Sequence, residues 1–288
     1  MVQRFEPLFS SADELEAFSD AIGPGAPGWT LEYREQVSST SDWALQAARA
    51  GAGHGKTLVA DAQTAGRGQR GRSWHSPPGA GLLFSSIVRG PGLTPDRMGW
   101  VALCAGWACA EALHAEAGIE VRLKWPNDLV ALTAAPRKSW QKLGGILVES
   151  RVTEQLRVEY AVVGVGLNVN QQREELPQDA RTPPASLRLL TGRVLGRRAL
   201  LAAVLQRLAL RFEWVRGSGD FVSVREGLRE AYRSWWGGWM LRVRTPQGER
   251  AGQFESLTPH GRLRLTGPDG RAITLSDAEW IHGECAAP

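Results

Sequence analysis

Two consecutive glycines, Gly237 and Gly238, divide the chain into two stretches with different residue patterns. After them, short alternating runs are separated by the turn sequences Pro-Gln-Gly, Pro-His-Gly and Pro-Asp-Gly, which is typical of a small all-β unit. Before them, strand-like runs alternate with segments of helical period. We therefore predict two domains, residues 1–237 and residues 238–288, the second a small β-barrel.

Within the first domain the periodicity predicts helices over residues 11–21, 42–50 and 97–117, and further helices within 186–236. It predicts strands over residues 30–37, 57–62, 82–88, 120–124, 143–152 and 158–169, with a loop at 133–140. In the second domain, strands are expected at 240–244, 262–266 and 272–275.

Composition excludes several classes of protein. The 288 residues are 43% hydrophobic and 22% charged, as in ordinary globular proteins. The longest apolar run, residues 98–110, is too short to span a membrane, and acidic residues interrupt the N-terminus where a signal peptide needs an apolar core. Three cysteines without a Cys-x-x-Cys pair favour a cytoplasmic protein. The net charge of +4 forms no basic stripe, which disfavours nucleic-acid binding.

Residues 66–72 hold three glycines and three arginines but no acid. Glycine allows the backbone N–H groups to approach an anion, and guanidinium groups match phosphate. The alternative is a solvated surface turn. Because the segment directly follows a buried-looking strand, we favour an anion-binding site.

Two further motifs carry lysine next to a predicted strand. Residues 124–128 read Lys-Trp-Pro-Asn-Asp, and the oxygens of Asn127 and Asp128 suit magnesium, although Asn-Asp is also common in type I turns. Lys142 stands shortly before Gly145 at the start of a strand, where small residues would let a ligand lie flat. The alternative for Lys142 is an edge lysine that discourages aggregation.

Other patterns are weaker. Residues 164–170, Gly-Val-Gly-Leu-Asn-Val-Asn, would let a ligand approach the sheet but lack the third glycine of a dinucleotide fingerprint. Residues 50–57 end like a phosphate-binding P-loop, but a helix precedes them, so we interpret them as a helix stop. The five histidines show no zinc spacing, and no Gly-x-Ser-x-Gly nucleophile motif occurs.

Taken in order, these motifs resemble the biotin protein ligases. The resemblance rests on residues 38–41, 63–74, 124–128, 142–149 and 164–170, and it covers roughly residues 36–190. It implies an α+β fold with a mixed, largely antiparallel sheet backed by helices, related to the class II synthetases, and a small C-terminal β-barrel. It also implies a cytoplasmic ligase that uses biotin and magnesium-ATP to form biotinyl-5'-AMP. Biotin would then pass to a lysine of the biotin carboxyl carrier protein of an acyl-CoA carboxylase.

The resemblance assigns roles to particular residues. Biotin would be bound by Ser39, Thr40, Ser41, Gln63, Arg67, Gly68, Gln69, Lys142 and Gly145. ATP would be bound by Arg70, Arg72, Trp74, Lys124, Asn127 and Asn168, and magnesium by Asp128 and Asn168. Lys142 and Arg67 would be catalytic, because two anions must meet and their charge must be neutralised.

The chain departs from the family pattern in places. Gln69 stands where many members have Arg, which removes one charge that would retain the adenylate, and residues 133–141 form a long loop for this point in the family. The family's C-terminal barrel pattern is matched only loosely at residues 277–280. About 37 residues precede the first motif, too few for the winged helix of some members, so we expect no DNA-binding repressor activity.

Two alternative functions stay open. One is a lipoate or octanoate protein ligase or transferase, and the other is a catalytically idle biotin-binding regulator. The Gly-Arg-Gly and Lys-Trp-Pro-Asn-Asp motifs favour biotin over lipoate, and the presence of Lys142, Arg67 and Asp128 argues against an idle protein. Family members pair through sheet edges, so a homodimer is compatible with the resemblance. We expect no membrane partner.

Overall fold

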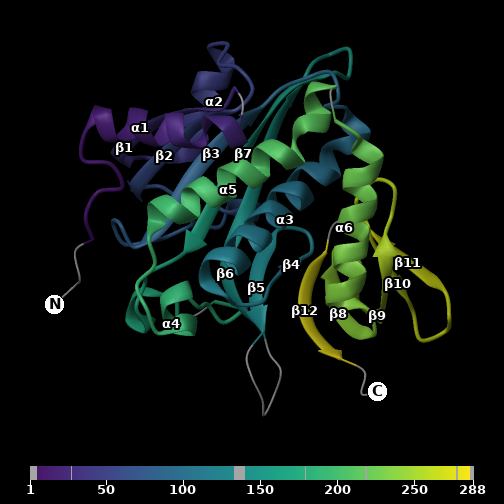
Figure 1. The fold of residues 1–288 in the computed structure, drawn as a ribbon. Helices are drawn as coiled ribbons and strands as arrows, with labels where there is room; N and C mark the ends of the chain where they lie inside the picture. Colours follow the sequence, from purple (N-terminus) through teal and green to yellow (C-terminus); the bar gives the residue numbers. More distant parts are fainter. Residues whose placement is uncertain are drawn as a thin grey trace.

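The computed structural model describes residues 5–26, 28–132, 140–178, 180–217, 219–276 and 278–285. Its centre is a seven-stranded sheet with the strand order β1-β2-β3-β7-β6-β5-β4 (Figure 1). The strands are β1 (Thr30–Val37), β2 (Lys56–Gln63), β3 (Gly81–Val88), β4 (Val121–Lys124), β5 (Asp128–Leu132), β6 (Trp140–Val152) and β7 (Val158–Asn168). β1 and β2 are parallel and the other neighbouring pairs are antiparallel, which confirms the predicted mixed, largely antiparallel sheet.

Both faces of this sheet are covered, because successive residues of a strand point to opposite sides. Leu58 of β2 and Val162 of β7 pack with helix α2 (Thr40–Arg49), whereas their neighbours Val59 and Val163 belong to the core on the other face. β3 lies in the middle of the sheet and is buried along its whole length. Its sequence accordingly contains no charged residue.

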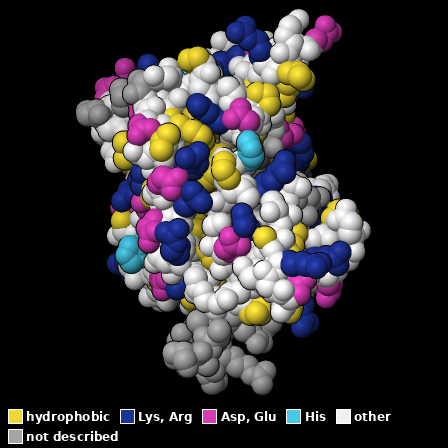
Figure 2. Space-filling model, turned by 90° about the vertical axis from the view of Figure 1, so that its right-hand side faces the viewer, with side chains coloured by type: hydrophobic (Ala, Val, Ile, Leu, Met, Phe, Trp, Pro, Cys, Tyr) yellow, Lys and Arg dark blue, Asp and Glu magenta, His cyan; other side chains and the backbone are white. Residues whose placement is uncertain are grey.

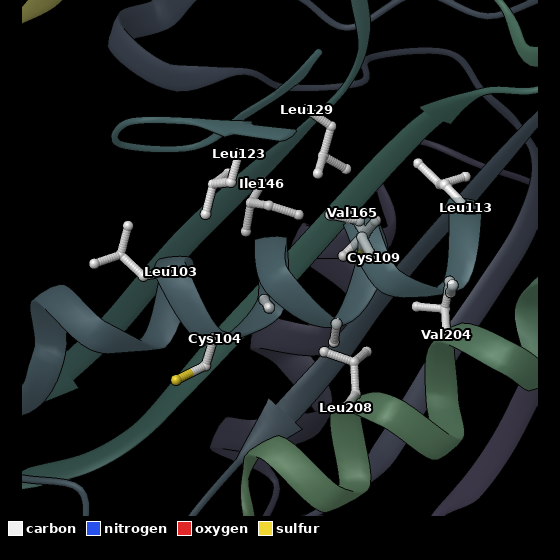
Figure 3. Packing of buried hydrophobic residues seen from close by; sticks show 14 of the residues in the cluster. Leu103, Cys104, Cys109, Leu113, Leu123, Leu129, Ile146, Val165, Val204 and Leu208 are labelled. Atoms are coloured by element: carbon white, nitrogen blue, oxygen red, sulfur yellow. The ribbon is translucent and has the colours of Figure 1, made fainter. Parts of the chain in front are cut away.

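Helices α1 (Ala12–Ile22), α3 (Met98–Ala117) and α5 (Arg197–Arg211) cover the face opposite α2, and α6 (Phe221–Trp236) packs beside α3 (Figure 1). α3 is apolar on nearly all sides because it lies between the sheet and α5. Figure 3 shows it between the strand residues Leu123 and Val165 and residue Leu208 of α5. Burial raises the pKa of the Cys104 thiol in α3 to about 12, so this thiol is a packing group. A further short helix, α4, spans Leu187–Thr191.

After α6 the chain forms a second sheet of five antiparallel strands, which we call the C-terminal sheet. Its strands are β8 (Trp239–Thr245), β9 (Gly248–Leu257), β10 (Leu263–Thr266), β11 (Ala272–Leu275) and β12 (Glu279–Cys285), in the order β11-β10-β9-β8-β12. The small all-β unit predicted after the two glycines is therefore present. It lies beside α6 (Figure 1).

Tryptophan side chains attach the C-terminal sheet to the rest of the molecule. The indole N–H of Trp100 donates to the Pro259 carbonyl oxygen (2.8 Å), and that of Trp125 donates to the Gly261 carbonyl oxygen (2.9 Å). The turn between β9 and β10 also packs on the start of α3, where a Cβ atom on Gly99 would lie 2.5 Å from the His260 carbonyl oxygen. Four more rings form a cluster with centroids 4.9–6.0 Å apart, which we call the tryptophan cluster: Trp140, Trp236, Trp239 and Trp280.

The structure departs from the predicted elements at four strands. β5 was not predicted, and it forms because the turn after β4 lets Leu129–Ala131 pair with both β4 and β6. β6 begins at Trp140, so the predicted loop at 133–140 is wrong at its last residue, while residues 133–139 lie outside the described part of the chain. β9 and β12 were also missed, because charged residues obscure their alternation.

The surface is mixed in charge. On the face shown in Figure 2, Lys and Arg side chains are interleaved with Asp and Glu side chains. None of the helices in the described ranges combines the length and the hydrophobicity of a membrane span.

Candidate functional site

A cavity opens on the face of the sheet that carries α2, and the motifs singled out in the sequence converge on it. Its walls come from the N-terminus of α2, the turn after β4, strands β6 and β7, and residues 66–72, which we call the Gly-Arg loop. Five of the lining side chains are basic, namely Arg67, Arg70, Arg72, Lys124 and Lys142, and one, Asp128, is acidic. The cavity is therefore suited to an anion.

Glycines form a flat floor on which the Trp74 indole lies. A Cβ atom on Gly166 would lie 2.5 Å from Trp74 Cε2, and one on Gly164 would lie 2.5 Å from Ser41 Oγ. Gly145, the strand partner of Gly166, would place a Cβ atom 3.7 Å from the same indole. Only glycine at 164 and 166 lets Trp74 and the start of α2 approach the sheet this closely. Trp74 Nε1 is buried and has no hydrogen-bond partner among the described residues, so it is available to a ligand.

One end of the cavity is polar and uncharged. Gln63 Oε1 accepts hydrogen bonds from the Thr40 backbone N–H (2.7 Å) and from Thr40 Oγ1 (3.0 Å). Ser85 Oγ donates to Thr40 Oγ1 (2.9 Å) and lies 3.2 Å from Ser41 Oγ. Because the Gln63 oxygen is occupied by Thr40, its amide N–H groups remain as donors. This end suits a neutral group of the amide or urea type.

The other end is charged. Lys142 Nζ on β6 lies 2.5 Å from Asp128 Oδ1 on the adjacent strand β5, and it lies 5.8 Å from the Trp74 ring centroid. Lys124, at the end of β4, is only 3% exposed, and its Nζ donates to Thr182 Oγ1 (3.1 Å). Two ammonium groups thus stand where the cavity floor meets β4 and β5. A buried ammonium group favours an anionic ligand, because desolvation strengthens their attraction.

The Gly-Arg loop is a small hairpin anchored at the rim of the cavity. The Gly68 N–H donates to the Arg72 carbonyl oxygen (2.6 Å), and Arg70 adopts a left-handed backbone with φ 56°. Arg67 forms a two-pronged pair with Glu149 of β6 (2.9 and 2.5 Å) and also contacts Asp42 of α2 (2.8 Å). The hydrogen bond to Glu149 raises the pKa of Arg67. The loop is therefore connected to both α2 and β6.

The cavity brings together most of the residues that the sequence predicted for it. The predicted residues that line it are Thr40, Ser41, Gln63, Arg67, Gly68, Gln69, Arg70, Arg72, Trp74, Lys124, Asn127, Asp128, Lys142 and Gly145. Ser39 and Asn168 do not line it. Ser39 Oγ accepts the Asp42 N–H (3.4 Å) and caps α2, while the Asn168 amide donates to the Ala185 carbonyl oxygen (3.0 Å). Both side chains have structural partners next to the cavity.

The sequence did not predict every lining residue. Most of the lining residues to which it assigned no individual role lie inside the quoted motifs: Ser73, Trp125, Pro126, Ile146, Leu147, Gly164, Val165 and Gly166. Two others are Trp280 of β12 and Ala278, which directly precedes that strand. Glu149 and Asp42, which hold Arg67, were also missed as partners. Both residues lie in or beside a quoted motif. The motif does not show that they pair with Arg67, because that ion pair forms only in the folded chain.

The residues at the charged end fit a magnesium ion that arrives with a nucleotide. No group of three or more His, Cys, Asp or Glu in the described ranges could hold a metal ion. Asp128 supplies one carboxylate, and magnesium bound to ATP needs only one or two, the remaining ligands being phosphate oxygens and water. Asn127 Nδ2 donates to the Ile146 carbonyl oxygen (2.7 Å), so this amide holds the turn after β4 against β6.

Comparison with known proteins identifies the class to which this fold and cavity belong. The model of the Biotin/lipoate A/B protein ligase family matches residues 33–168. The biotin–[acetyl-CoA-carboxylase] ligase of Mycobacterium tuberculosis is 32% identical over 277 residues, covering 94% of this chain and 95% of that protein. The bifunctional ligase/repressor BirA of Bacillus spizizenii is 32% identical over 258 residues, covering 88% of this chain and 74% of that protein.

A solved structure agrees with these relatives. The biotin protein ligase from Aquifex aeolicus, in complex with biotin and ATP, superposes with a TM-score of 0.69 at 25% identity, covering 89% of this chain and 99% of that chain. The chain belongs to the family of biotin protein ligases.

Proposed function

We propose that this protein is an ATP-dependent biotin protein ligase that forms biotinyl-5'-AMP and transfers the biotinyl group to a lysine of a biotin carboxyl carrier protein. The observation that carries the proposal is the polarity of the cavity. Its uncharged end, at Thr40, Ser41 and Gln63, suits the ureido ring of biotin, and its cationic end suits the biotin carboxylate and a phosphate. Solved relatives that bind biotin and ATP support it.

In the first step, a carboxylate oxygen of biotin attacks the α-phosphorus of ATP and pyrophosphate leaves. Two anions must approach each other, so the main requirement is charge neutralisation and positioning. Lys142 lies at the charged end, and the arginines of the Gly-Arg loop line the same cavity. Magnesium, where bound with ATP beside Asp128, would supply further neutralisation of the phosphates.

In the second step, the carrier lysine amine attacks the carbonyl carbon of the mixed anhydride, and AMP leaves with the bonding electrons. Among the described lining residues there is no cysteine or histidine, and the Thr40 hydroxyl is engaged with Gln63 and Ser85. We therefore expect direct transfer from the adenylate to the carrier rather than a covalent enzyme intermediate. The ion pair with Asp128 holds Lys142 in place while the substrate lysine reacts.

The proposal is tested by labelling a biotin-accepting domain of an acyl-CoA carboxylase. Purified protein, magnesium-ATP and biotin should add one biotinyl group to one lysine of that domain, detected by intact-mass and peptide mass spectrometry. Lipoate or octanoate in place of biotin should give no product. A lipoylated or octanoylated domain would assign the protein to the alternative activity, and no acylation with any acid would favour an idle biotin-binding regulator.

The absence of repressor activity stays a prediction. The described residues ahead of Ser38 form α1, a short turn and β1. An electrophoretic shift assay with the promoter DNA of the organism's own biotin genes, in the presence of biotin and ATP, should show no complex. A specific shifted band would contradict this prediction.

A further inference from the structure

Trp280 brings the C-terminal sheet into the wall of the cavity. The residue lies on β12, opposite Val243 of β8, and its side chain lines the cavity. Its side chain is 2% exposed and packs edge-on against Trp236, with ring centroids 4.9 Å apart. The indole is therefore fixed in place by its neighbours, and one side of it faces the cavity.

The indole N–H of Trp280 is buried and has no hydrogen-bond partner among the described residues. Other tryptophans in the same region do have one. Trp236 donates to the Leu123 carbonyl oxygen (3.0 Å), and Trp125 donates to Gly261. A buried donor without an acceptor is costly, so an acceptor supplied by a ligand would recover that cost.

The position of Trp280 identifies the kind of acceptor. Its ring lies 6.0 Å from that of Trp140, and the Lys124 ammonium lies 5.5 Å from the same Trp140 ring. Lys124 lines the same cavity as Trp280. Trp280 therefore lies toward the cationic end of the cavity, on the side of Lys124. Acceptors drawn to that end are anionic oxygens.

We propose that the Trp280 indole N–H donates a hydrogen bond to a phosphate oxygen of the bound nucleotide, so that the C-terminal sheet forms part of the nucleotide site. This inference rests on the proposed function, because it takes ATP as the ligand of the charged end. It makes Trp280 a binding residue for the polyphosphate, while the uncharged end that would hold biotin is formed without the C-terminal sheet.

The test is the substitution Trp280→Phe, which removes the N–H but keeps an aromatic ring in the tryptophan cluster. Isothermal titration calorimetry of the full chain should show that magnesium-ATP and inorganic tripolyphosphate bind about tenfold more weakly, the loss of one hydrogen bond to a charged group. Binding of adenosine and of biotin should be unchanged, because neither presents a phosphate.

Trp239→Phe is the matched control. Trp239 belongs to the same cluster and is similarly buried, at 5% exposed, but it does not line the cavity. The Trp239→Phe variant should bind magnesium-ATP, tripolyphosphate, adenosine and biotin with unchanged affinity. Thermal unfolding of both variants establishes that they fold. Equal weakening of magnesium-ATP binding in both variants would overturn the inference. Unchanged affinity of Trp280→Phe for magnesium-ATP would also overturn it. If the unsubstituted protein itself binds no ATP, the proposed function fails instead.

Discussion

Arg67 is the residue that links the Gly-Arg loop to the body of the protein. Two carboxylates hold its guanidinium group, Glu149 on β6 and Asp42 on α2, and the side chain is partly exposed. Such a pair contributes little to global stability. Its effect is local, because it ties a glycine-rich segment to α2 and β6.

The substitution Glu149→Gln should therefore loosen the loop without unfolding the protein. Trypsin cleaves after arginine, so cleavage within residues 67–72 should become several-fold faster while the melting temperature changes by less than about 2 °C. Glu154→Gln, in the exposed turn between β6 and β7, is the control and should leave the cleavage rate unchanged. An unaltered cleavage pattern in Glu149→Gln would show that the loop is held by other contacts.

His54 predicts a pH dependence of stability. Burial, with a smaller contribution from the positive charge of Arg216, lowers the pKa of His54 from 6.5 to about 4. The neutral ring accepts the Arg89 N–H at Nδ1 (3.2 Å) and packs against Trp29. The unfolded chain binds a proton at His54 more readily, so this contribution to stability is complete above pH 6.5 and is lost as the pH falls toward 4.

Urea unfolding at a series of pH values measures this effect. Between pH 6.5 and 4.5 the free energy of unfolding of the natural protein should fall more steeply than that of His54→Gln, with a difference of about 1–2 kcal/mol after allowance for partial exposure. Parallel curves for the two proteins would show that His54 does not titrate with folding.

Among the elements, β7 has one part that packs under α2 and a glycine-containing part that lines the cavity. Val162 packs under α2, and the next residues on that face, Gly164 and Gly166, leave room for Ser41 and the Trp74 indole to lie against the strand. Gly166→Ala should push the Trp74 indole off the floor and weaken biotin binding at least tenfold, measured by calorimetry. Gly53→Ala, where a Cβ atom meets nothing within 4 Å, is the control. Unchanged biotin affinity in Gly166→Ala would show that the position of the Trp74 indole does not determine biotin binding.

The elements also show what the sequence could predict. β3 and α3 were evident, because a strand buried on both faces and a helix buried on nearly all sides have long apolar runs. β5 has only five residues and depends on pairing with β4 and β6, which are not visible in its own pattern. Lys142 was placed before a strand but lies inside β6, because its pairing with Val130 extends the strand toward the N-terminus.

At the scale of the whole molecule, sequence motifs predict only those parts of the cavity that come from contiguous residues. The Gly-Arg loop and residues 124–128 were found because their chemistry lies within short contiguous motifs. Trp280 stands far along the chain from Lys142, and only the docking of the C-terminal sheet brings it to the cavity. Asn168 was assigned from its motif, and its contact with Ala185 could not be foreseen from that motif.

The docking of the C-terminal sheet predicts how the molecule unfolds. The proposed division at residue 237 separates two sheets, yet tryptophans of the first domain donate to the backbone of the second and the tryptophan cluster spans both. We expect a single calorimetric unfolding transition. Trp100→Phe, which loses the hydrogen bond to Pro259, should lower the free energy of unfolding by about 1 kcal/mol or more. Two resolved transitions in the natural protein would show that the sheets are independent.

We propose that this cavity activates the carboxylate of biotin with ATP. Exchange of labelled pyrophosphate into ATP measures that step directly, because it requires the reversible formation of an acyl adenylate. With purified protein and magnesium, we expect exchange that depends on biotin and is absent with lipoate or octanoate. Exchange in the absence of biotin, or no exchange with any of the three acids, would contradict the proposed activation of biotin.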